Sequence, residues 1–453
     1  MKKHIIITAC LLSATVVGTS AQTYSGYFLE DYTHRYQMNP AFGNEETFIG
    51  IPGINNVNSA MRGNLRLTDV FYNLDGRTVL FTNPGISEGE AMKKFGNHNK
   101  LEAGVNIELL SGGFKAWGGY NTVSFGVRAN AGVNVPKELF SLAKEGISNQ
   151  TYDIKDLSMQ ARAFGQIALN HSRDIKQVPG LRVGAALKFY LGAINIDGYF
   201  DKAQLRLGEN SWTATTQGNI YASASGMKFK MKRNEDTGRD YIDGIDYKFK
   251  GLDGFGIGFD LGASYKWRDF NFSLAVLDLG FISWGKTQWA AADGEEINTV
   301  SYHFNANEDA PNSFKKEWER FRDDLSGLYQ FSDKGELSSR TRAMAATINV
   351  GVEYELPAYR PLHFGFLSST VINGAYTWSQ ARFSANVKPV KWVSASASLE
   401  ASTFGVGFGW LLNFYPKGVN IFIGMDHTMG KLAKQGIPLN SNGSMNLGFN
   451  IHF

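Results

Sequence analysis

Asp260 and Asp278, each followed by Leu-Gly, are the residues of this sequence best suited to acid–base chemistry. Two carboxylates can exchange a proton with a substrate when both line one water-filled site. Asp260 stands on the polar side of the alternation around it, so it is expected to face an interior. Asp278 stands on the apolar side of its own run, so it must lie at a rim or after a shift in strand register. We therefore expect structural roles for both acids.

Other signatures of catalysis are missing from the sequence. The eight histidines follow no metal-ligand spacing, no Gly-rich phosphate loop precedes a helix, and no Gly-x-Ser-x-Gly elbow occurs. The formal net charge is only +3, whereas nucleic-acid-binding proteins need a strongly basic face. We predict no catalytic residue, no metal, no cofactor and no nucleic-acid partner, and hence that the protein is not an enzyme.

Residues 1–21 have the pattern of a secretory signal peptide. A basic start at Lys2 precedes an apolar run over 5–17, and small residues at 19–21 suit cleavage before Gln22. The only cysteine, Cys10, lies within this leader, so the mature chain is expected to have no thiol. The stretch 7–10 also matches a lipoprotein box, but the apolar run continues past it, which favours the signal peptide.

Alternation of apolar and polar residues runs through the rest of the chain and predicts the elements that position any site. Over 121–135, for example, Val123, Phe125 and Val127 alternate with Ser124 and Arg128, as in a strand with two different faces. No stretch after the leader is apolar for about 18 residues, as a spanning helix would be. The predicted strands are 55–67, 101–117, 121–135, 157–171, 181–194, 198–208, 211–223, 254–267, 269–281, 342–356, 362–371, 379–388, 390–400, 402–414, 418–427 and 443–453.

This pattern predicts an all-β fold, a transmembrane antiparallel barrel of 14–16 strands over residues 55–453. Gaps between the strands alternate between short and long, as periplasmic turns and extracellular loops do. The last strand is amphipathic and ends on Phe453, which resembles the signal that outer-membrane barrels present to their assembly machinery. We expect the outer membrane of a Gram-negative bacterium as the location, with its lipids and that machinery as partners.

Two segments resemble known barrel families. The run Tyr36–Phe42 (YQMNPAF) resembles the Asn-Pro-Ala segment near the mature N-terminus of FadL-like and PorV-like outer-membrane proteins. The run 254–284 is similar to a strand–turn–strand segment of a related domain family of unknown function. The resemblance implies fourteen strands and an N-terminal segment that folds back into the lumen as a plug. Transporter members pass hydrophobic molecules, whereas PorV-like members serve protein secretion, and the long charged loop 282–341 departs from the fatty-acid transporters.

Residues 22–54 are the predicted plug. They form no long alternating run, yet they carry more apolar surface than a solvated tail should expose. The resemblance places Asn39, Pro40 and Ala41 in the plug, and Phe42 adjoins them as a gating residue. Asn39 would fix a turn through its side chain, and Pro40 would prevent pairing as a strand. The alternative is a tail on the periplasmic rim.

Two helices are expected in the long loops. One covers 136–146, with proline at its start and glycine at its end. In the other, apolar residues recur in steps of four and three along one helix face. That face consists of Phe314, Trp318, Phe321, Leu325 and Leu328. It is either packed over the barrel mouth or presented to a protein partner at the cell surface.

Two functions remain open at this point. The first is a plugged channel for uptake or transport of a small hydrophobic or amphipathic ligand. The second is a non-transporting interaction protein, either a secretion accessory or a scaffold for surface partners. An apolar lumen beside the plug would favour the channel, and a filled lumen with an exposed apolar patch on the loops would favour the scaffold.

Overall fold

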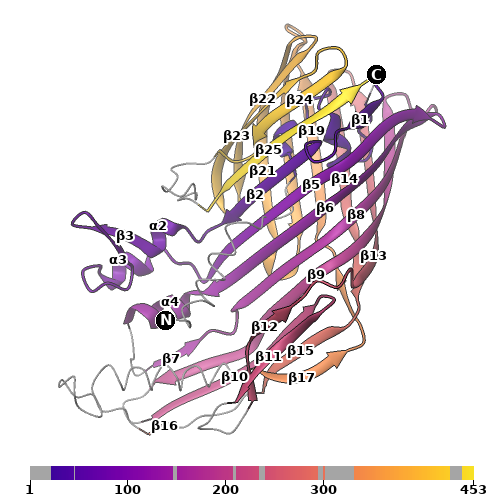
Figure 1. Ribbon diagram of the computed structural model, residues 1–453. Coiled ribbons are helices and arrows are strands. Elements are labelled where there is room, and N and C mark those ends of the chain that lie inside the picture. The colour runs from indigo at the N-terminus through magenta and orange to yellow at the C-terminus, as the bar shows by residue number, and fades with distance from the viewer. Residues whose placement is uncertain are drawn as a thin grey trace.

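The alternating segments form long antiparallel strands in the computed structural model, which describes residues 22–44, 46–145, 150–207, 211–233, 240–293, 299–300, 331–428 and 441–453. Fourteen of them pair in sequence, and β2 pairs with β25, which closes a barrel (Figure 1). The ring consists of β2 (Asn56–Gly63), β5 (His98–Ala116), β6 (Gly119–Pro136), β8 (Ser158–Asp174), β9 (Leu181–Leu207), β13 (Gly254–Trp267), β14 (Phe270–Trp284), β19 (Ala346–Glu355), β20 (Leu362–Ile372), β21 (Trp378–Val390), β22 (Val393–Ser402), β23 (Gly405–Phe414), β24 (Val419–Met425) and β25 (Gly443–His452).

The remaining elements lie inside the barrel, at its seam or beyond one rim. They are η1 (Tyr24–Gly26), η2 (Thr33–Gln37), β1 (Phe48–Gly50), α2 (Leu67–Val70), β3 (Phe71–Leu74), β4 (Arg77–Leu80), α3 (Glu88–Met92), α4 (Lys137–Glu145), β7 (Gln150–Asp153), β10 (Ser211–Ser223), β11 (Met227–Arg233), β12 (Asp240–Tyr247), β15 (Thr287–Asp293), β16 (Thr299–Val300), β17 (Ser332–Leu337), β18 (Arg340–Ala343) and η3 (Gly374–Tyr376). None of the helices in the described ranges is long and apolar enough to cross a bilayer.

The sequence-based strand list divides one strand in two. The predicted strands 181–194 and 198–208 are both parts of the continuous β9. The predicted gap contains Asn195 and Asp197, whose residue types favour turns, but their side chains find partners on other strands. Asn195 accepts a hydrogen bond from Arg162 Nε at 3.1 Å, and Asp197 pairs with Arg340 at 2.5 Å and with Arg342 at 3.1 Å. The predicted strand 211–223 is β10, which lies outside the closed ring.

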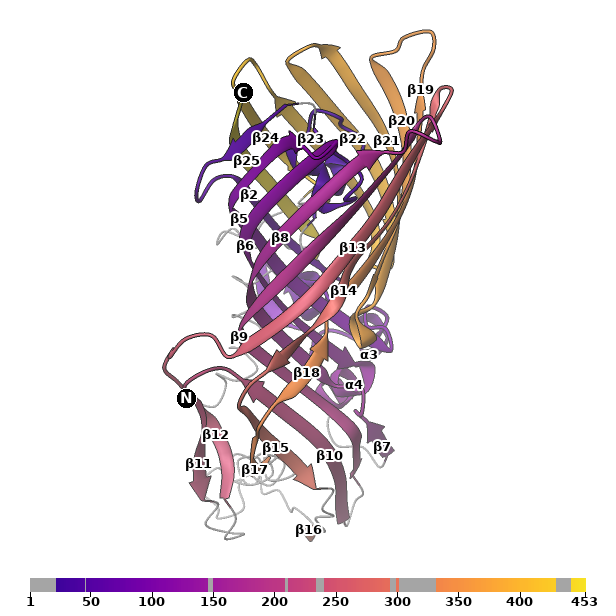
Figure 2. The same cartoon turned by 90° about the vertical axis from the view of Figure 1, so that its right-hand side faces the viewer.

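A small sheet continues the barrel wall beyond one rim. The second half of β9 leaves β13 and pairs with β10, which in turn pairs with β15, and β15 pairs with β17. Figure 2 shows this sheet at the end of the barrel opposite the C-terminus. The long connections lie at the same end, together with α2, α3 and α4, whereas the connections at the C-terminal end are short turns.

A register change in the wall explains the position of Asp278. Phe259 lies opposite Leu279, but Leu261 lies opposite Val276, so β14 has one extra residue there. Asp278 has a φ of +57° and is 3% exposed, as expected of a residue turned inward at a bulge. Of the two positions that the sequence allowed for Asp278, a rim or a register change, the structure shows the register change.

The outer face of the ring is apolar and the inner face is polar. Residues such as Val123, Phe255 and Leu399 are exposed on the outside, while their strand neighbours are buried. This is the two-faced surface of a barrel in lipid, in which every backbone group is paired around the ring. Residues 1–21 lie outside the described residues, as do Phe314, Trp318, Phe321 and Leu325 of the predicted loop helix.

Introducing a charge on the outer face should destabilise the barrel. Val127, on β6, and Val178, in the turn between β8 and β9, are similarly exposed at 38% and 42%. We expect Val127→Arg to lower the free energy of unfolding by about 2–4 kcal/mol, as for a cation near the bilayer midplane. Val178→Arg, in a turn, should cost far less. Urea unfolding in lipid vesicles measures both, and equal costs would mean that Val127 does not face lipid.

Candidate functional site: the plugged lumen

Residues 22–42, called the plug from here on, lie inside the barrel (Figures 1 and 2). Their two short 3-10 helices leave most backbone groups to be satisfied by turns and by the wall. Tyr27 packs edge-on against Phe28 and Phe42, with ring centroids 4.9 and 5.2 Å apart. The guanidinium of Arg35 lies 4.2 Å from the centre of the Phe42 ring and donates to the carbonyl of Tyr27. These rings belong to an apolar cluster that the plug shares with wall residues such as Trp378 and Phe422.

Asn39 organises the turn that sequence analysis assigned to the plug. Its Oδ1 accepts a hydrogen bond from the Ala41 amide at 2.9 Å, and its Nδ2 donates to the carbonyl of Ala263 on β13 at 3.2 Å. The Pro40 carbonyl accepts from Asn170 Nδ2 at 3.3 Å. The turn therefore contacts β8 and β13 through polar groups.

Two wall glycines make room for this turn. A Cβ at Gly262 would lie 2.1 Å from Asn39 Oδ1, and a Cβ at Gly184 would lie 2.1 Å from the Pro40 carbonyl oxygen. Both distances are far below contact, so any side chain at either position would displace the plug turn. The wall is shaped to hold the turn at this place.

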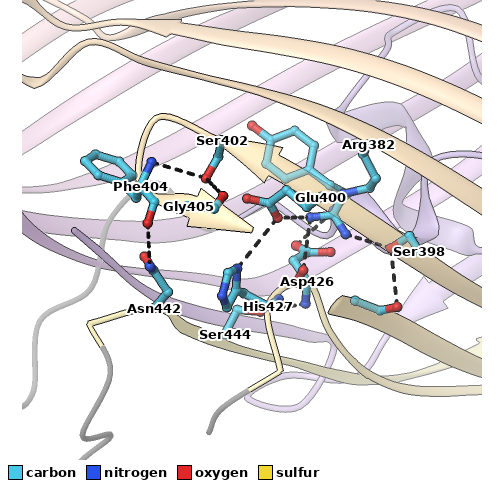
Figure 3. Close-up of polar contacts among 12 residues, drawn as sticks. Arg382, Ser398, Glu400, Ser402, Phe404, Gly405, Asp426, His427, Asn442 and Ser444 are labelled. Atoms are coloured by element: carbon cyan, nitrogen blue, oxygen red, sulfur yellow. Dashed lines mark hydrogen bonds and ion pairs between the residues drawn. The ribbon is translucent and has the colours of Figure 1, made fainter. Parts of the chain in front are cut away.

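The first turn of the plug is held by a cluster of charged groups on the opposite part of the wall (Figure 3). Asp426, at the end of β24, accepts hydrogen bonds from the amides of Tyr24 at 2.9 Å and Ser25 at 2.5 Å. Arg382 donates to the backbone carbonyl of Asp426 at 3.0 Å and forms a buried ion pair with Glu400. We call Asp426, Arg382 and Glu400 the latch.

Glu108 on β5 is a second anchor for the plug. Both of its carboxylate oxygens lie 2.9 Å from Tyr36 Oη, and His34 Nδ1 lies 3.1 Å from Oε1. Gln37 also donates to this carboxylate, and Asn55 does so from the wall at 3.0 Å. A buried carboxylate is costly unless it is hydrogen-bonded in this way, so Glu108 and the plug stabilise each other.

The structure brings the two aspartates singled out by the sequence together in the lumen. Lys188 Nζ lies 2.6 Å from each carboxylate, and Arg128 pairs with Asp278 at 2.8 Å. Asp260 accepts the backbone amide of Asp278 at 2.7 Å, and Tyr190 donates to Asp278 at 3.1 Å. Two cations thus balance two carboxylates, so the two aspartates have a structural role.

Little free space remains around this charge cluster. A cavity of about 30 Å³ beside it is lined by plug and wall residues, including Tyr36, Glu108 and Lys188. A second, of about 20 Å³, lies by Arg128 and Arg162. Each volume holds only about one or two water molecules, so neither cavity has room for a larger solute.

A second segment crosses the lumen nearer the long-loop end. Residues 373–377, called the strap, connect β20 to β21 and include η3. The hydroxyl of Tyr376 donates to the Gly132 carbonyl on β6 at 3.3 Å and lies 3.3 Å from Ser158 Oγ on β8. Since β6 and β8 lie on the other side of the ring from β20 and β21, the strap crosses the lumen.

The comparisons with known proteins give a family without an assigned activity. A family model, described as a family of unknown function (DUF5723), matches residues 40–426. The chain belongs to this family. A search of curated proteins found no match.

The fold is also similar to solved structures. The Pseudomonas putida toluene transporter TodX is 9% identical, with a TM-score of 0.37, over 96% of this chain and 94% of that one. A Pseudomonas aeruginosa FadL homologue is 10% identical, with a TM-score of 0.34, over 97% and 95%. The CymD monoaromatic hydrocarbon channel is 10% identical, with a TM-score of 0.34, over 92% and 91%.

Sequence analysis of this DUF5723 member found the plug turn but missed what holds the plug. Asp426, Arg382 and Glu108 were not singled out, although charged residues on the inward face of a strand are a usable signal. The partners Lys188 and Arg128 of the two aspartates were missed for the same reason. Among the described residues, no group of three or more His, Cys, Asp or Glu side chains is arranged to hold a metal ion.

Breaking the latch should loosen the plug. Asp426→Ala removes both acceptors for the Tyr24 and Ser25 amides, and hydrogen bonds to a charged group contribute about 1.5–3 kcal/mol each. We expect the ion conductance of the purified protein in planar bilayers to rise about tenfold or more. Asp333→Ala on the exposed strand β17 is the matched control and should leave conductance unchanged. An unchanged conductance in Asp426→Ala would show that the latch does not hold the plug closed.

Proposed function

We propose that the protein is an outer-membrane channel that the plug closes and that opens to pass a small amphipathic molecule. The observation that carries the proposal is the plug itself. A barrel of fourteen strands encloses more space than its own side chains fill. Here a separate stretch of chain fills that space, and it continues into the wall only through β1, so it can move without breaking the ring.

The plug is held by polar and by apolar contacts. Individual hydrogen bonds join it to the wall at Asp426, Glu108, Asn170 and Ala263. Its aromatic residues also pack against wall residues such as Trp378 and Phe422. When the plug moves, water can replace the partners of the polar contacts. Charged and amide groups line the lumen, whereas the plug contributes aromatic surface. A solute with a polar and an apolar part suits both surfaces, which favours an amphipathic solute over a pure hydrocarbon.

The proposal includes the surroundings of the barrel. The apolar outer face would contact outer-membrane lipids, and the terminal strand β25 would present the barrel to its assembly machinery. Catalysis is not part of the proposal, because the buried acids Asp260 and Asp278 are neutralised by Lys188 and Arg128.

A second candidate function is supported by one observation. The chain from β12 towards β13 exposes Ile245, Tyr247, Phe249 and Leu252, with Phe249 61% and Leu252 54% exposed. Apolar side chains gathered on a loop are typical of contact with another protein. A non-transporting interaction protein at the cell surface is therefore the alternative to the channel.

Deleting residues 22–42 behind an intact leader tests the channel. We expect the barrel to assemble, as judged by its heat-dependent mobility in gels, because its fourteen-strand ring remains complete. Permeability of proteoliposomes to small sugars should rise by on the order of tenfold or more, because an open lumen of this size is filled with water. Assembled protein whose permeability equals that of the full-length chain would contradict the channel and favour the interaction protein.

A further inference from the structure

A cleft of about 360 Å³ opens at the long-loop end of the barrel, above the charge cluster. One side is formed by the ends of β5, β6, β8 and β9, and the other by the strap. Its size falls within the range of about 300–1,000 Å³ that is usual for small-molecule sites.

The charges of the cleft favour an anion. Two lysines and a histidine line it, against one carboxylate, that of Asp156. Asp156 lies 3.9 Å from His98 Nδ1, and Lys155 lies 3.4 Å from Asp153. Lys100 has no carboxylate within 4 Å among the residues that the structure describes, although it interacts electrostatically with the buried Glu102 on the same strand. Its ammonium therefore forms no direct ion pair there and can bind a carboxylate from outside.

The buried side chain of Asn134 needs a hydrogen-bond donor. Asn134 is 3% exposed, and its Nδ2 donates to the Asp156 carbonyl at 2.6 Å. Within the described chain, its Oδ1 has no hydrogen-bond donor. A buried acceptor of this kind is costly unless something donates to it, and a hydroxyl on a bound molecule would do so.

The remaining lining is aromatic. Tyr199 and Phe200 are adjacent on β9 and both line the cleft, with Leu157 and Ala375 beside them. The ring of Phe200 packs against Phe331, with centroids 5.5 Å apart, which fixes its orientation. Aromatic side chains of this kind favour a planar ring in the ligand.

We propose that this cleft binds a small ring-bearing carboxylate that also carries a hydroxyl group. Lys100 would pair with the carboxylate, Asn134 would accept from the hydroxyl, and Tyr199 and Phe200 would contact the ring. The strap forms part of the cleft, and Tyr376 joins the strap to β6 and β8. A ligand in the cleft thus contacts a loop that crosses the lumen, and its role as the transported solute rests on the channel proposed above.

Binding is measured on the full-length protein in lipid nanodiscs, which avoids detergent in the cleft. The probe is 6-hydroxy-2-naphthoate, followed by its own fluorescence. We expect saturable binding, weakened about tenfold in Lys100→Gln, because a charge-assisted hydrogen bond is lost. Lys176→Gln, in the exposed turn between β8 and β9 at the other end of the barrel, is the matched control and should bind like the unaltered protein. Heat-dependent gel mobility verifies that each variant is folded.

Two related probes test the assigned chemistry. 2-Naphthol lacks the carboxylate and 2-naphthoate lacks the hydroxyl, so each should bind more weakly than the parent probe. Equal affinity of Lys100→Gln and unaltered protein, or equal affinity for 2-naphthol and the parent probe, would overturn the site. The permeability of the plug-deleted protein is a separate measurement. If the probe binds but plug deletion does not raise permeability, the site stands and the channel is contradicted. If plug deletion raises permeability but the probe does not bind, only the site is contradicted.

Discussion

Closure of the ring at the seam between β2 and β25 is the constraint on which the rest of the structure depends. Val57 lies opposite Leu447 and Met61 opposite Gly443, so the chain's first ring strand joins its last. In lipid an open sheet edge would leave backbone groups unpaired, and only a closed ring avoids that cost. The strand β1 lies in the same seam, between β25 and β5. The seam therefore also fixes where the plug leaves the wall and enters the lumen.

A closed ring of this size creates an interior that must be filled, and the protein fills it with an apolar cluster shared by plug and wall and with buried polar contacts. Around the lumen, carboxylates meet cations or amides: Asp278 meets Arg128, Glu400 meets Arg382, and Glu108 meets the plug. Isolated buried charges would be costly in free energy. Paired charges hold segments of the chain in defined places and still allow these segments to move. Two segments of the chain cross the lumen as a result, the plug and the strap, and they lie at different depths.

Much of the barrel could be predicted from sequence, because period-two alternation is a local signal. The register change at Asp278 followed from its parity, and the turn at Asn39 followed from its residue types. The continuity of β9 did not, because Asn195 and Asp197 are turn formers whose partners lie on other strands. The latch could not be predicted either, because Tyr24 and Asp426 are 402 residues apart in the chain and nothing local to either residue predicts the contact.

The central claim is that the plug must move for solutes to pass, and a reversible tether tests it most directly. Thr23 Oγ1 and Asn58 Oδ1 are 2.7 Å apart, and the only cysteine, Cys10, lies in the predicted leader. Thr23→Cys with Asn58→Cys, joined by a short bis-thiol crosslinker with a reducible bond, would fix the plug to β2. Solute flux into proteoliposomes should be abolished in the crosslinked protein and return on reduction. Equal flux before and after reduction would contradict the account.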